Sequence, residues 1–189
     1  MSLLDSIAEQ IRGCTRCPLA EGRMQAVPGV GPADAEIMLI GEAPGAEEDA
    51  QGEPFVGKAG QVLTVLLRNA GLERSDVYIT NICKCRPPQN RDPNPDEVRA
   101  CREYLDGQIA CIRPTLICTL GRWAAQTLLD DPDLSVMKAN GTVIEHRGLT
   151  VVPLIHPAAG LHNQNMQDPI KEGFRKLGEL LQERREGGA

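Results

Sequence analysis

Short apolar runs alternating with amphipathic segments constrain the fold of this chain more than any other feature. Four runs have the length and composition of buried strands, and they lie at residues 37–40, 77–81, 116–120 and 149–154. Between them stand segments with apolar residues at helical spacing, such as residues 58–70. This alternation predicts an α/β fold: a three-layer α/β/α sandwich around a central, mainly parallel four-stranded sheet.

Capping residues mark the ends of several predicted helices. Asn94 is followed by Pro95 and Glu97, the pattern of a helix start with an N-cap and a capping box. Gly71 stands where the helix over residues 58–70 should end. Segments 142–145 and 149–154 flank Arg147-Gly148 and predict a hairpin whose second arm is the last core strand.

The length of 189 residues suits one folded unit. We therefore expect a single domain over residues 1–189, with a frayed tail at 183–189. No apolar run approaches the roughly 20 residues needed to span a bilayer, and the first residues lack the pattern of a secretory signal. These features predict a cytoplasmic protein without membrane association.

The formal net charge of −6 by itself disfavours nucleic-acid binding, because duplex binding depends on neutralising phosphates. The distribution of charge matters more than the total. Lys84, Arg86 and Arg91 gather in one Pro-rich stretch, whereas acidic residues concentrate at residues 42–53 and in the tail. This pattern predicts a basic loop on an acidic body, which is compatible with DNA.

Seven cysteines are an odd number for a chain expected in the cytoplasm, so metal binding and core packing come before disulfides. Cys14 and Cys17 form a C-x-x-C motif, and Cys85 and Cys101 supply two further thiols. A predicted helix precedes the motif and Pro18 follows it, which disfavours a thioredoxin-type redox centre. Four thiolates suit tetrahedral zinc and an iron–sulfur cluster equally well.

The other three cysteines lie in apolar or strand-like surroundings, where a cysteine is usually a small buried hydrophobe. They are Cys83, Cys111 and Cys118. Of these, Cys83 is the main rival to Cys85 as a metal ligand.

Polar residues follow the predicted strands, at the sheet edge where ligands bind in open α/β folds. The turn at residues 41–45 is either a plain loop or a site that brings backbone amides near a ligand. Asn81 offers a donor and an acceptor to a heterocycle, and His156 follows the last strand. Phe55, in a Gly-bounded polar loop, is either a stacking platform for a base or a hydrophobic plug. Together these residues predict one pocket for a flat heterocycle.

Taken in order, these residues resemble the family 4 uracil-DNA glycosylases, the iron–sulfur branch of the uracil glycosylase superfamily. The resemblance runs through residues 14–163 and includes Thr80-Asn81, Lys84-Cys85-Arg86-Pro87-Pro88 and His156-Pro157-Ala158-Ala159. It implies a uracil-DNA glycosylase fold and a DNA-repair enzyme that hydrolyses the N-glycosidic bond of deoxyuridine, releasing uracil and leaving an abasic site. It also implies a structural 4Fe–4S cluster, with ligands Cys14, Cys17, Cys85 and Cys101.

The resemblance also implies roles for individual residues. Phe55 would stack on the flipped uracil, Asn81 would bond its polar edge, and His156 would donate toward the oxygen that gains charge. Glu42 and Glu48 would order or activate the attacking water. Another branch of the superfamily has a water-activating Asp at the position of Ala43, so the resemblance leaves the general base open. Further substrate contacts would come from Gly41, Ala43, Gly45, Asn90 and, as a wedge into the duplex, Leu161.

Two alternative functions belong to other classes. One is a non-turnover binder of the X type, which traps DNA through a histidine on a basic loop insertion; here residues 87–91 are short and contain no histidine. The other is a cysteine–metal module without DNA chemistry. We expect a monomer whose partner is uracil-containing DNA, single- or double-stranded, and which is associated with the nucleoid when it acts.

Overall fold

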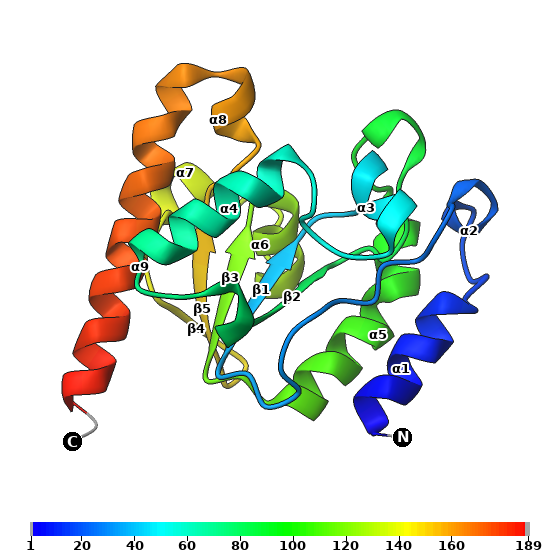
Figure 1. Cartoon of the computed structure of the whole chain (residues 1–189), viewed down its shortest axis with the longest axis horizontal. Coiled ribbons are helices and arrows are strands. Elements are labelled where there is room, and N and C mark those ends of the chain that lie inside the picture. Colours follow the sequence, from blue (N-terminus) through cyan, green and yellow to red (C-terminus); the bar gives the residue numbers. More distant parts are fainter. Residues whose placement is uncertain (1, 188–189) are drawn as a thin grey trace.

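The computed structural model describes residues 2–187 and contains one sheet with helices on both faces (Figure 1). Its strands are β1 (Ile37–Gly41), β2 (Val77–Asn81), β3 (Leu116–Leu120), β4 (Ile144–His146) and β5 (Leu149–Leu154). The five-stranded sheet has the order β2-β1-β3-β5-β4, and β4 pairs antiparallel with β5. The predicted α/β class and mainly parallel sheet are confirmed. The sheet has five strands rather than four because the first arm of the hairpin adds a short edge strand.

The longer helices include the one expected from apolar periodicity over residues 58–70 and the one expected to start at Asn94. They are α1 (Leu3–Arg12), α4 (Lys58–Asn69), α5 (Pro95–Ile112), α6 (Arg122–Leu129) and α9 (Gln167–Gly187). Shorter helices are α2 (Leu19–Gly22), α3 (Ala46–Gln51), α7 (Val136–Ala139) and α8 (Ala159–His162), with 3₁₀ turns at Arg74–Asp76, Pro88–Asn90 and Gln164–Met166. One or two turns are too few to leave a periodic pattern in the sequence.

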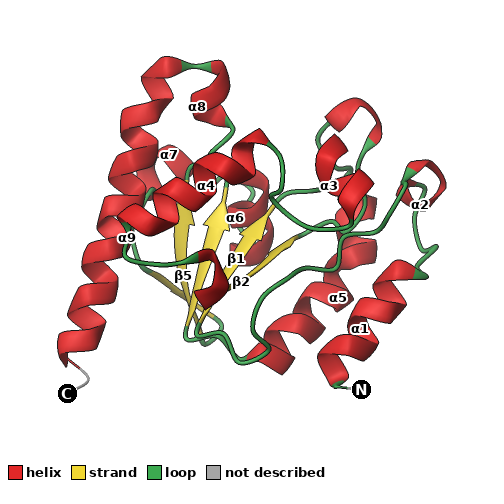
Figure 2. Cartoon of the chain, viewed as in Figure 1, coloured by secondary structure: helices red, strands yellow, loops and turns green. Residues whose placement is uncertain are grey.

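Helices cover both faces of the sheet (Figure 2), and alternate residues of the central strand pack in different apolar clusters. Leu39 and Ile79 pack in the apolar cluster that includes α4 and α9, whereas Met38 and Ile40 pack in the cluster that includes α5 and α6. A strand buried on both faces reads as a continuous apolar run, which is why the sequence predicts these strands.

The two ends of the chain are helical. Ser2 Oγ accepts from the Asp5 amide at 3.1 Å, and an Asp5 carboxylate oxygen accepts from the Ser2 amide at 2.8 Å, so α1 begins with a reciprocal capping box. At the other end, α9 continues to Gly187, through most of the segment expected to fray. Residues 188–189 of that segment lie outside the described residues. No helix within residues 2–187 is long and apolar enough to cross a membrane.

The sheet topology places the ends of several strands beside one another. β1 lies between β2 and β3, so the chain runs from β1 to β2 on one side and then returns past β1 to β3 on the other. In open α/β sheets, such a reversal opens a crevice beyond the carboxyl ends of the strands. Gly41 ends β1 and pairs in register with Asn81 at the end of β2, and His156 follows β5 at the same edge.

Candidate active site

A cavity of about 620 Å³ opens at this carboxyl edge of the sheet. Among its lining residues are Glu42, Ala43, Gly45, Glu48, Phe55, Asn81, Asn90 and His156. Apart from Gly41 and Leu161, these are all the catalytic and substrate-binding residues that the sequence predicts. Lys58, Arg91 and His162 also line the cavity; sequence analysis did not assign them to it, because nothing in their local pattern distinguishes them from surface residues.

The rings of Phe55 and His156 form one wall of the cavity. Their centroids lie 5.6 Å apart, with an angle of 28° between the ring planes. Phe55 adopts a φ of 53°, a left-handed conformation that is uncommon for a bulky residue. Gly60 permits this loop to press against α4, because a Cβ at Gly60 would lie 1.8 Å from the Phe55 carbonyl oxygen. Phe55 therefore both joins the core and faces the cavity.

Asn81 lines the cavity and carries a buried polar atom without a partner in residues 2–187. Its side chain is buried, and within the described residues its Oδ1 has no hydrogen-bond partner. Leaving a buried acceptor unpaired costs about 1–3 kcal/mol, so a ligand that donates to this oxygen would gain that energy. Gly41 lies beneath it, since a Cβ there would stand 2.4 Å from Asn81 Oδ1 and 2.7 Å from Phe55 Cζ.

His156 is held as a neutral imidazole with a defined tautomer. The Ala158 amide donates to His156 Nδ1 at 3.1 Å, so the ring proton belongs on Nε2. Burial lowers the pKa of His156 to about 4, against a smaller upward effect of the Glu48 carboxylate. The ring therefore offers a neutral N–H donor to the cavity near pH 7.

The two carboxylates have different environments. Glu48 Oε1 accepts from the amides of Val56 and Gly57 at 3.0 and 2.9 Å, and Oε2 accepts from the Gly45 amide at 3.1 Å. Glu48 thus joins the loop after β1 to the loop that carries Phe55.

Glu42 is half-buried, and it makes none of the amide contacts that hold Glu48. Burial raises the pKa of Glu42 to about 7, assisted by the negative charge of Asp92 and opposed by Arg122. A carboxylate with a pKa near neutrality has the properties of a general base.

The mouth of the cavity is built from two loops. Asn90 Oδ1 accepts from Arg86 Nε at 2.8 Å, and Arg91 makes two bonds of 2.7 and 2.9 Å to the buried carboxylate of Glu97. On the other side, Leu161 lies on α8 with 46% of its surface exposed, next to His162 on the rim. Leu161 is therefore an exposed apolar side chain next to a residue that lines the cavity.

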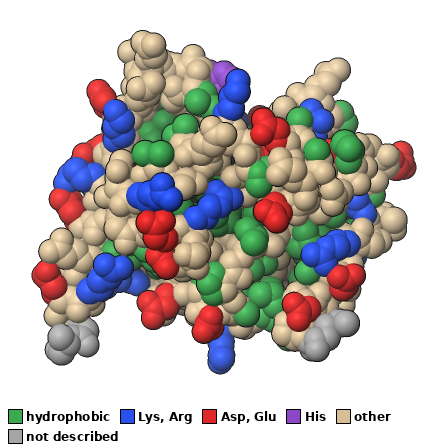
Figure 3. All heavy atoms as spheres, viewed as in Figure 1, with side chains coloured by type: hydrophobic (Ala, Val, Ile, Leu, Met, Phe, Trp, Pro, Cys, Tyr) green, Lys and Arg blue, Asp and Glu red, His purple; other side chains and the backbone are tan. Residues whose placement is uncertain are grey.

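The expected basic loop is less basic than its sequence indicates. Lys84 is only 1% exposed, and its ammonium group contacts neutral oxygens in the interior, so the prediction that it contributes to a basic surface is wrong. Figure 3 shows acidic and basic side chains interspersed over the face in view. Sequence alone missed this burial because Lys84 lies in a Pro-rich polar stretch.

The cysteines form a second cluster, near the N-terminal helix. Cys85 packs in an apolar group with Ile11, Leu19 and Tyr104, and Cys14 and Cys17 lie against that group. The thiols are close enough for charge on Cys101 to act on both Cys17 and Cys85.

The surroundings of these thiols suit a thiolate-bound group. Arg23 donates a hydrogen bond to Cys85 Sγ at 3.1 Å, as it would to a thiolate ligand. Cys83 also contacts Cys101, so it stays a rival to Cys85 as a ligand. In the described part of the chain, no three His, Cys, Asp or Glu side chains converge tightly enough to hold a single metal ion. The fit of these residues to a larger cluster rests on the proximity of Cys101 to Cys17 and Cys85 and on the Arg23 hydrogen bond.

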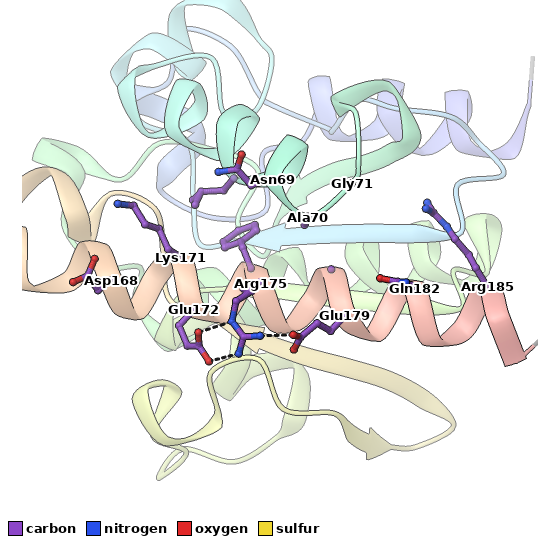
Figure 4. Close-up of a pocket in the computed structure, with 13 residues that line it drawn as sticks. Asn69, Ala70, Gly71, Asp168, Lys171, Glu172, Arg175, Glu179, Gln182 and Arg185 are labelled. Carbon is purple, nitrogen blue, oxygen red and sulfur yellow. Dashed lines mark hydrogen bonds and ion pairs between the residues drawn. The ribbon is translucent and has the colours of Figure 1, made fainter.

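A different hollow, of about 690 Å³, lies between α4 and α9 (Figure 4). Within it, Arg175 pairs with both Glu172 and Glu179. It shares no lining residue with the cavity at the carboxyl edge. The cavity at the carboxyl edge is therefore separate from this hollow.

An α/β sandwich with an aromatic, amide and imidazole pocket at the carboxyl edge of its sheet is the architecture of a base-excising enzyme. Residues 28–178 match the family model described as "Uracil DNA glycosylase superfamily", and the chain belongs to this superfamily. It is 46% identical to a type-4 uracil-DNA glycosylase of Archaeoglobus fulgidus, over 95% of this chain and 94% of the relative. Identity to the type-4 enzyme of Saccharolobus solfataricus is 47%, over 96% and 88% of the two chains. The chain is a member of the type-4 uracil-DNA glycosylase family.

Type-5 enzymes are more distant relatives. The chain is 36% identical to a type-5 uracil-DNA glycosylase of Thermus thermophilus, over 54% of this chain and 53% of the relative. Both the identity to this type-5 enzyme and the share of the two chains that is matched are lower than for the type-4 enzymes.

Proposed function

We propose that this chain excises uracil from DNA by hydrolysing the N-glycosidic bond of deoxyuridine, which leaves an abasic site. The single observation that carries the proposal is the convergence of Phe55, Asn81 and His156, far apart in sequence, around one cavity. Membership of a family whose relatives are named uracil-DNA glycosylases supports the same reaction.

Recognition of uracil follows from the chemistry of the pocket. An enzyme that acts on a base must extrude it from the stack, and Phe55 offers the flipped ring a stacking surface. Asn81 Oδ1 would accept from uracil N3–H while its amide nitrogen donates to O4. Cytosine has the opposite arrangement of donor and acceptor, so it would leave buried polar groups unpaired.

Bond cleavage requires that charge on the departing uracil be stabilised. The base leaves as an anion while the sugar becomes oxocarbenium-like. His156 Nε2–H would donate to the uracil oxygen that gains charge, and a single fixed donor of this kind contributes about 3–4 kcal/mol. Because the imidazole is neutral, it stabilises the anion without transferring a proton to it.

We assign the two carboxylates separate tasks. Glu42, with its raised pKa, would activate the attacking water and face the positive charge that develops on the sugar. Glu48 already accepts three amide hydrogen bonds, so we infer that it shapes the pocket by holding the loops of Gly45 and Phe55 together.

The remaining contacts concern the DNA. Leu161 would enter the space left by the extruded nucleotide, and Asn90 would contact that nucleotide at the mouth of the cavity. Gly41, Ala43 and Gly45 would let the backbone after β1 approach the base closely, because a larger side chain at Gly41 would meet Asn81 and Phe55.

We further propose that Cys14, Cys17, Cys85 and Cys101 hold a structural 4Fe–4S cluster. These thiols come from the loop after α1, the loop after β2 and helix α5. Such a group would cross-link three segments that meet in a small apolar cluster, and it would steady the loop that leads from Asn81 to Asn90.

The proposed reaction is tested by incubating the protein with a uracil-containing oligonucleotide and cleaving abasic sites with alkali. Wild-type protein should release uracil over many turnovers, and His156→Ala should reduce kcat about 10²–10³-fold. His146→Ala, a histidine that pairs with Asp130 away from the cavity, is the matched control and should retain activity.

Each alternative function predicts a different result in the same assay. One covalent adduct per protein molecule would indicate the X type. An absence of any uracil release would leave only a cysteine–metal module.

A further inference from the structure

We propose that Lys84 is a positioning residue for uracil recognition: its buried ammonium group fixes the main chain of Asn81 so that the Asn81 amide faces the pocket. The inference rests on the proposed function for its catalytic consequence. Lys84 Nζ donates to Thr80 Oγ1 at 2.6 Å, to the Asn81 carbonyl at 2.7 Å and to Gln108 Oε1 at 2.7 Å.

Simple packing does not account for a lysine at this place. An ammonium group has three donors, and here each donor has one buried acceptor. All three acceptors are neutral oxygens. Burying a charge is costly, and an apolar side chain of similar volume would usually serve stability as well or better. The buried lysine therefore indicates a requirement for its specific geometry.

The position of Asn81 in the sheet explains that requirement. β2 is an edge strand. Its outer side pairs with Val30 at Ile79, through bonds of 3.0 and 2.8 Å. Ile82 instead donates inward, to the Gly41 carbonyl. Backbone groups alternate in direction along a strand, so the Asn81 carbonyl points outward, beyond the segment that Val30 covers. Lys84 Nζ supplies the donor that a neighbouring strand would otherwise provide.

The lysine is itself anchored from two directions. Gln108 on α5 and Thr80 on β2 both donate to the carbonyl of Pro28, at 2.8 and 2.7 Å. This network connects α5, β2 and the segment before β1 to Lys84. Asn81 Oδ1, in contrast, has no partner within the described residues. The direction of the Asn81 amide is therefore set by its main chain, which Lys84 holds.

The test compares Lys84→Met with a control of similar thermal stability, Leu128→Ala. Leu128 lies on α6 and is buried in the apolar layer on the other side of the sheet from Phe55. We expect Lys84→Met to accelerate amide hydrogen exchange at residues 80–82 beyond the control. We also expect weaker inhibition by free uracil and a higher KM, each by about tenfold to a hundredfold, with a smaller change in kcat. Excision of cytosine relative to uracil should rise. Visible absorbance is recorded throughout because Lys84 adjoins Cys85.

Equal exchange, uracil inhibition and selectivity in Lys84→Met and Leu128→Ala would overturn the proposal. Thr80→Val removes one anchor of Lys84 and should shift the same readouts in the same direction by a smaller factor. If Lys84→Met does not fold, an unchanged Thr80→Val overturns the proposal. If wild-type protein releases no uracil, the proposed function fails, and hydrogen exchange at residues 80–82 still decides whether Lys84 holds Asn81.

Discussion

The backbone amide of Ala158 donates a hydrogen bond to Nδ1 of His156 at 3.1 Å. This contact between residues two apart in the turn after β5 determines which ring nitrogen carries the proton. It leaves Nε2–H free for a ligand in the cavity, and burial keeps the ring neutral by lowering the pKa of His156 to about 4. A neutral donor is suited to a leaving group that departs as an anion.

The pH dependence of excision should report Glu42. Because the pKa of Glu42 is raised to about 7, kcat/KM should fall as the pH drops below about 7 and the base becomes protonated. His156 stays neutral until about pH 4 and should add no change in this range. Rates measured for wild type and Glu42→Gln test the assignment. If kcat/KM of Glu42→Gln falls below pH 7 as it does in wild type, Glu42 is not the group whose protonation causes the fall.

The same carboxyl group should affect stability. Its folded-state pKa of about 7 lies above the ordinary value of 4.5, so ionised Glu42 destabilises the fold increasingly as pH rises between these values. Glu42→Gln should therefore raise the midpoint of thermal unfolding above pH 7 and have little effect below pH 4.5. Thermal unfolding at both extremes measures the difference. An equal effect at both would argue against a raised pKa.

Discrimination between uracil and cytosine should depend on the Asn81 amide. Replacing Asn81 with Asp removes the donor to uracil O4 and, when the carboxyl group is protonated, offers a pattern compatible with cytosine. We expect weaker uracil excision and a larger cytosine-to-uracil ratio, measured on paired oligonucleotides. Asn69→Asp, at the end of α4 outside the cavity, should change neither quantity. Selectivity equal to wild type in Asn81→Asp would count against this role.

The floor of the pocket should not tolerate a side chain at Gly41. An added Cβ would stand 2.4 Å from Asn81 Oδ1 and 2.7 Å from Phe55 Cζ, which displaces both groups. A misplacement of this order costs roughly a hundredfold in rate, so Gly41→Ala should lower kcat/KM by about that factor. Gly22→Ala meets nothing within 4 Å and is the control. Full activity in Gly41→Ala would show that Asn81 and Phe55 can accommodate the added methyl group without loss of function.

The proposed cluster ligands can be separated from the other cysteines. Cys85→Ala should abolish bound iron and visible absorbance in protein purified without oxygen, whereas Cys118→Ala, buried within β3, should retain both. Cys83→Ala should also retain the iron. If Cys83→Ala loses the iron and Cys85→Ala retains it, Cys83 rather than Cys85 is the cluster ligand. A colourless wild-type protein containing zinc would replace the cluster by a zinc site.

Local patterns in the sequence were sufficient for the architecture of this protein. The four core strands follow from runs such as residues 116–120, which are apolar because both of their faces are covered. The start of α5 follows from Asn94 and Pro95, since helix caps act over a single turn. The spacing of apolar residues and the capping of helices both depend on residues close together in the chain. They can therefore be recognised from the sequence alone.

The tertiary structure decided which polar groups already have hydrogen-bond partners within the protein and which do not. Glu42 and Glu48 stand close together in the sequence, yet three amides from two loops occupy Glu48 while burial makes Glu42 basic. Lys84 looks like part of a basic loop, but in the interior its ammonium group donates a hydrogen bond to Gln108 on a distant helix. Hydrogen-bond partners and burial depend on segments far apart in the chain. Protonation and orientation therefore emerge only once those segments pack together.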